Sequence, residues 1–180
     1  MLECFTLGWN VVGVVVLAAA ATAARSVALA GFGLDSLIEI GASTVVIWEL
    51  RGTSERRQEV GQRLIGFAFS LLAVYLAVQS TLTLAIGFRP HHSTVGIAWT
   101  AVTAAVMFFL AAGKAKTGAA LGNPVLVAEG RMTLIDGILA IAVLIGLVLH
   151  ALFGWWWADP VAGYVLVFYA AREARASLTH

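Results

Sequence analysis

Two acidic residues lie one helical turn apart in an otherwise apolar stretch of the sequence. Asp35 and Glu39 belong to the segment GFGLDSLIEIGAS, within an apolar run that is expected to form a helix over 30–50. Their i, i+4 spacing places both carboxylates on one helix face, about 6 Å apart at the Cβ atoms. Each costs about 2.5–3.5 kcal/mol in a lipid-embedded helix. A shared cation would offset this cost, so the pair predicts cation binding; a structural polar patch is the alternative.

A second acidic segment, VAEGRMTLIDG, lies in the apolar run 124–153. Helical spacing of i, i+3, i+4 and i+7 predicts that four of its side chains line a single face. These side chains are Glu129, Met132, Thr133 and Asp136. Asp136 falls near the centre of its span, where a carboxylate favours cation ligation over a simple interhelical hydrogen bond.

The two segments predict one site if their helices run in opposite directions across a membrane. Asp35 then lies level with Asp136, and Glu39 lies level with Met132. Three carboxylates and one thioether near the midplane form an oxygen-rich set that suits a divalent cation. Met132 is either a weak ligand or a packing residue. Glu129 lies about 10.5 Å from Asp136 along the helix axis, so it either relays the ion or simply faces the cytoplasmic mouth.

Other chemistry has little support in the sequence. His91 and His92 are adjacent, so their side chains diverge, and His150 lies near a helix end; a metal role for them is disfavoured. The single Cys4 excludes an intrachain disulfide and a thiolate cluster. No G-x-S-x-G, H-E-x-x-H, C-x-x-C or P-loop pattern occurs, so the chain is not expected to be an enzyme and no cofactor is predicted. The net charge of +1 gives no sign of a nucleic-acid partner.

The elements that position these residues are predicted to be membrane spans. The sequence is 61% hydrophobic and 12% charged, whereas soluble domains have about 45–50% apolar and roughly 25% charged residues. The fold class is therefore an all-α integral membrane protein with six transmembrane helices in a single domain, residues 1–180. The apolar runs predict helices near 5–24, 30–50, 64–87, 95–113, 124–153 and 158–174.

Basic residues predict the orientation of the bundle. Alternating spans place eight of them on one side and Arg89 on the other, with Arg25 near the interface of that second side. The eight are Arg51, Arg56, Arg57, Arg63, Lys114, Lys116, Arg172 and Arg175. By the positive-inside rule both termini are cytoplasmic, in the cell inner or plasma membrane. Asp159 is predicted to cap the last helix, with Pro160 at the first helical position.

Three segments together resemble the transmembrane domain of the cation diffusion facilitator family. They are SVALAGFGLDSLIEIGAS, AEGRMTLIDG and WWADPVAGYVLVFYAARE. The resemblance covers essentially the whole chain and implies six helices with cytoplasmic termini. Relatives commonly continue into a cytoplasmic metal-binding domain, whereas this sequence ends at His180, so the transmembrane domain alone is expected.

The resemblance also implies a site and an activity. Carried onto this sequence, the family's tetrahedral zinc site falls on Asp35, Glu39, Asp136 and, in the fourth position, Met132. The implied function is efflux of a divalent cation (zinc, manganese, iron or cobalt), usually in exchange for protons, with a homodimer weakly implied. Because Met132 stands where relatives have histidine or aspartate, we expect a lean toward manganese or iron(II), and a histidine at this position should favour zinc.

Two other functions remain open from the sequence. A membrane scaffold that keeps the fold and binds a metal or partner without transport is favoured by the altered fourth position. An intramembrane enzyme is disfavoured, since no nucleophile and base pair can be named. The buried acids, costly without a cation, favour transport over both.

Overall fold

Six helices make up the described part of the chain. The computed structural model covers residues 2–50, 55–120 and 124–178, with side chains for 5–41, 63–120 and 130–178. The helices are α1 (Leu2–Ala24), α2 (Val27–Leu50), α3 (Glu55–Ile86), α4 (Thr94–Ala120), α5 (Pro124–Phe153) and α6 (Ala158–Leu178). The predicted all-α membrane bundle of six helices is confirmed.

Within the described residues, four helical segments are long and apolar enough to cross a membrane. They are Phe5–Ala24, Arg63–Ile86, Thr94–Ala120 and Gly130–Phe153. Many of their large apolar side chains are exposed in the isolated chain, among them Val15, Phe67 and Phe109. Apolar side chains on the outside of a bundle suit contact with lipid.

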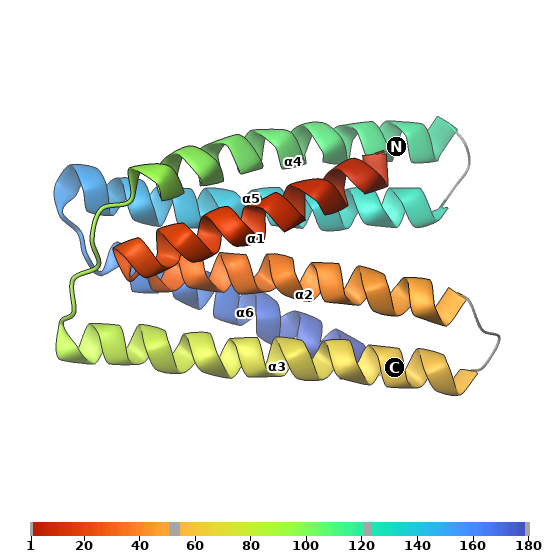
Figure 1. Cartoon of the computed structure of the whole chain (residues 1–180), viewed down its shortest axis with the longest axis horizontal. Helices are drawn as coiled ribbons and strands as arrows, with labels where there is room; N and C mark the ends of the chain where they lie inside the picture. Colours follow the sequence, from red (N-terminus) through yellow and green to blue (C-terminus); the bar gives the residue numbers. More distant parts are fainter. Residues whose placement is uncertain (1, 51–54, 121–123, 179–180) are drawn as a thin grey trace.

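Two helix pairs enclose the α1–α2 hairpin (Figure 1). The most extensive contacts join α4 to α5 and α3 to α6, while α2 touches α1, α3, α5 and α6. Helix α1 begins and α6 ends at one end of the bundle, which we call the terminal end. The opposite end, the turn end, carries the α1–α2 turn at Arg25 and the connections 87–93 and 154–157.

Helix α4 is longer than the sequence pattern predicts. The apolar run predicts that this helix ends near residue 113, but α4 continues to Ala120, so the predicted end is wrong. Lysine and alanine are good helix formers, and Lys114 is fully buried against α5. A Cβ atom at Gly130 would lie 3.1 Å from the Ala115 amide nitrogen. This close helix packing outweighs the intrinsic cost of glycine in a helix.

A buried aspartate fastens α6 to the start of α2. Asp159 accepts hydrogen bonds from the Ser26 hydroxyl and, at 3.0 Å, from the Val27 backbone nitrogen. The expected cap on its own helix is therefore not what the side chain provides, because α6 begins at Ala158 and the carboxylate satisfies the N-terminus of α2 instead.

Apolar side chains fill the bundle interior between its middle and the turn end, and we call this group the turn-end core. It comprises Leu29, Phe32, Leu139, Val143 and Leu166, all buried. Close packing there depends on small residues, since a Cβ at Gly31 would come within 2.7 Å of Leu76 and 2.9 Å of Leu166. This core lies between the turn end and the acidic residues of α2 and α5.

Candidate metal centre

Three carboxylates from α2 and α5 meet inside the bundle. Asp35, Glu39 and Asp136 each offer one oxygen, and these three oxygens lie within 4.8 Å of one another. Asp35 is 2% and Asp136 8% exposed, while Glu39 is half-buried. The i, i+4 pair on α2 therefore faces the acid on α5, as the sequence predicts. We call this group the carboxylate cluster.

The cluster has unused ligand capacity. Asp35 Oδ1 and Asp136 Oδ1 are buried and have no hydrogen-bond partner within the described part of the chain. A buried carboxylate oxygen without a partner carries a large desolvation cost. The Glu39 and Asp136 carboxylates lie within 4.8 Å of each other, and they repel each other when both are ionised. A cation at the centre would satisfy the free oxygens and offset the repulsion.

Helix α1 also contributes to the site, with a residue that the sequence analysis does not name. The Asn10 side-chain nitrogen donates a 2.9 Å hydrogen bond to Glu39 Oε2. Asn10 is 8% exposed, so its amide lies in the bundle interior. It is a lone amide among small and apolar residues in the segment WNVVGVVVLAAAA, and this isolation is the signal that could have identified it.

Further charged and polar side chains approach the cluster from α4 and α6. Tyr169 is buried, packs edge-on against Phe69 with ring centroids 6.1 Å apart, and interacts electrostatically with all three carboxylates. The charge of Glu173, one turn closer to the terminal end, reaches Asp35. Lys114 is the only positive group among the charges that act on Asp136 within the described residues. Sequence reasoning had counted Lys114 only as a loop charge.

The exposed side chain of Met132 lies outside the carboxylate cluster. Its exposed fraction is 55%, whereas the adjacent Thr133 is 2% exposed. The expectation that Met132 shares the buried face of Asp136 is therefore wrong. Residues three and four positions before Asp136 flank its direction on opposite sides, and the packing of α5 turns Thr133 inward. The side chain of Glu129, the predicted relay, lies outside the described residues.

Replacing Met132 with histidine is expected to leave the ratio of zinc to manganese affinity unchanged within about twofold. The sequence alone favours the opposite result, a shift toward zinc. An exposed imidazole on the outer face of α5 cannot join a site inside the bundle. Calorimetric titration of both metals into the wild type and the variant measures the ratio, and a clear rise for zinc would show that Met132 turns inward when metal binds.

The three histidines in the described part of the chain lie at the turn end, away from the cluster. His92 and His150 pack against each other as a tilted pair, with ring centroids 4.5 Å apart and an angle of 38° between the rings. His91 is exposed, and its backbone nitrogen bonds to the Ala24 carbonyl at 2.8 Å.

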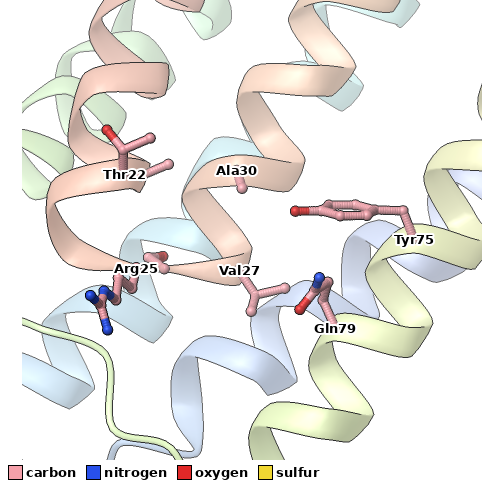
Figure 2. A pocket seen from close by; sticks show the side chains of 8 residues that line it. Thr22, Arg25, Val27, Ala30, Tyr75 and Gln79 are labelled. Carbon is pink, nitrogen blue, oxygen red and sulfur yellow. The ribbon is translucent and has the colours of Figure 1, made fainter.

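A pocket of about 240 Å³ opens near the same end, between the α1–α2 turn and α3 (Figure 2). Its lining residues are Ala21, Thr22, Arg25, Ser26, Val27, Ala30, Tyr75 and Gln79. Figure 2 shows the Tyr75 hydroxyl directed from α3 toward Ala30 on α2. The only charged lining group is Arg25, and no member of the carboxylate cluster takes part, so this pocket does not suit a cation.

An all-α membrane bundle with a buried carboxylate cluster defines a class of protein, one that handles cations within a bilayer. The chain matches the family model of the cation efflux transmembrane domain over residues 4–178. It therefore belongs to the cation efflux family, which confirms the resemblance to cation diffusion facilitators. The family's activity is metal cation transport rather than enzymatic catalysis. No curated protein matches the chain.

Proposed function

We propose that the protein exports a divalent metal cation from the cytoplasm through Asp35, Glu39 and Asp136, in exchange for protons. The observation that carries the proposal is the convergence of three carboxylate oxygens within 4.8 Å in the bundle interior. In a family of cation transporters, this cluster is the group best suited to hold the transported ion.

The charges of the site support exchange with protons. Three ionised carboxylates in a low-dielectric interior repel one another and are poorly solvated, so each state of the site needs compensating positive charge. A divalent cation provides it in one state. Protons on the same oxygens provide it in the other, and binding of one displaces the other. The cluster can therefore couple the two movements without a separate proton site.

The donor atoms favour a hard cation. With Met132 on the exterior, the three ligands on α2 and α5 are all oxygens. Oxygen ligands suit manganese and iron(II), while zinc gains more from imidazole or thiolate ligands. We therefore expect transport of manganese or iron(II) to compete well with transport of zinc and cobalt.

Flux into purified proteoliposomes tests the proposal. Manganese, iron(II), zinc and cobalt are offered to vesicles that contain the protein, with and without an opposing pH gradient, and uptake is followed by a trapped metal-sensitive dye. We expect metal uptake that increases with the gradient and an accompanying proton movement. Metal binding without uptake would favour a scaffold that keeps the fold without transport. Equal metal uptake with and without the pH gradient would show that protons are not the counter-ion.

Both termini are expected to be cytoplasmic. Helix α1 begins and α6 ends at the terminal end of the bundle, the same end as the basic residues Lys116, Arg172 and Arg175. The positive-inside rule places that end in the cytoplasm. Reporter fusions at each terminus, one active only inside the cell and one only outside, measure the orientation. An external location of either terminus contradicts the predicted topology.

A further inference from the structure

Asn10 brings a third helix, α1, into hydrogen-bond contact with the carboxylate cluster. It lies one α2 turn nearer the terminal end than Asp35, level with Glu39, to which its amide nitrogen donates at 2.9 Å. A buried amide in a lipid-embedded helix is costly unless its polar atoms are satisfied. Interior helix packing alone would be served better by an apolar side chain, so this amide calls for a role at the site.

The side-chain amide of Asn10 has two polar atoms with opposite roles. Its nitrogen donates hydrogen bonds and its oxygen accepts them or binds a cation, and a half-turn about χ2 exchanges the two. In the structure, the nitrogen faces the Glu39 carboxylate. With a cation between Glu39 and its neighbours, the same position favours the oxygen, because a positive ion repels an amide nitrogen. Asparagine oxygens and carboxylates together are common ligands of hard divalent ions.

The fourth ligand position also needs a candidate. The cluster provides three carboxylates, and Met132 is 55% exposed. We propose that the side-chain oxygen of Asn10 is a fourth protein ligand of the transported cation. The ligand set then comes from α1, α2 and α5 and consists of oxygen only. This inference rests on the proposed metal site, and it adds the residue that sets its preference for hard cations.

The test introduces an imidazole at this position. In Asn10→His, a nitrogen ligand replaces the amide oxygen, so the ratio of zinc to manganese affinity is expected to rise at least about tenfold. X-ray absorption at the zinc edge should show one imidazole in the first coordination shell of this variant and none in the wild type. The matched control is Thr22→His, which adds the same group at an exposed site farther along α1.

Two further variants separate ligation from packing. Asn10→Leu keeps the approximate volume and removes the oxygen, so manganese affinity should fall at least about tenfold. Asn10→Asp keeps an oxygen ligand and should bind manganese at least as tightly as the leucine variant. All titrations use the full chain in lipid nanodiscs, with monodispersity and helix content as checks of folding.

The outcomes distinguish this inference from the proposed function. If the wild type binds no metal, the metal site itself is wrong. If the wild type and Asn10→Leu bind manganese equally well, or if zinc in Asn10→His has no imidazole neighbour, Asn10 is not a ligand while the metal site stands. A residue that only orients Glu39 would weaken both metals in Asn10→His without changing their ratio, and this result also overturns the proposal.

Discussion

Replacing Asp35 or Asp136 with asparagine is expected to lower metal flux at least about 100-fold, because even partners outside the first coordination shell change metal affinity by about 10–100-fold. Each substitution removes an anionic ligand and keeps the side-chain volume. Flux in proteoliposomes and metal binding by calorimetry should fall together. Wild-type flux in either variant would contradict the assignment of the site.

The same substitutions should have the opposite effect on stability. Both aspartates have a buried oxygen without a hydrogen-bond partner among the residues that the structure describes, so neutralising either one removes charge repulsion and a desolvation cost. In metal-free protein, the melting temperature of each variant should equal or exceed that of the wild type. Ser36→Ala is the matched control beside Asp35, since it loses only a bond to the Phe32 carbonyl within α2. A loss of flux with a loss of fold would indicate a structural role instead.

Replacing Asp159 with alanine is expected to lower the free energy of unfolding by about 3 kcal/mol or more, since hydrogen bonds to a charged group contribute about 1.5–3 kcal/mol each. The carboxylate is fully buried and accepts hydrogen bonds from the Ser26 hydroxyl and the Val27 backbone nitrogen. Its loss leaves these donors unpaired inside the bundle. Thermal or denaturant unfolding in detergent micelles measures the change.

Two controls define what the Asp159 result means. Ser26→Ala removes one of the two donors and should cost about 1 kcal/mol. Thr22→Val removes only intrahelical bonds on exposed α1 surface and should have little effect. If Asp159→Ala is no less stable than Ser26→Ala, the carboxylate does not hold α2 to α6.

The sequence predicted the carboxylates because charge in a lipid-embedded helix is costly and must have a reason. Asp35 and Glu39 also share one α2 face by spacing alone, which the structure reproduces. The sequence pattern did not predict Asn10, because burying a single amide in a lipid-embedded helix costs far less free energy than burying a charge. An isolated amide is therefore a weak signal of a site. Its importance appears only when α1 is placed against α2.

The rotation of each helix about its own axis could not be predicted in the same way. Met132 and Thr133 both lie close to the direction of Asp136 on a helical wheel, and the neighbours of α5 decide which one is buried. Asp159 shows the same limit. Its position at a helix start predicted a local cap, but a partner distant in sequence, Val27, competed successfully for the carboxylate.

The hydrogen bond from the Val27 backbone nitrogen to Asp159 holds α2 at the turn end, so a tilt of α2 about this point moves its other residues. From a rise of 1.5 Å per residue, Asp35 lies about 12 Å and Glu39 about 18 Å from Val27 along the axis. A tilt of α2 by about 10° about Val27 therefore displaces Asp35 by about 2 Å and Glu39 by about 3 Å. Because metal–oxygen distances in such sites are defined within about 0.2 Å, a modest tilt of this one helix is enough to assemble or dismantle the coordination sphere.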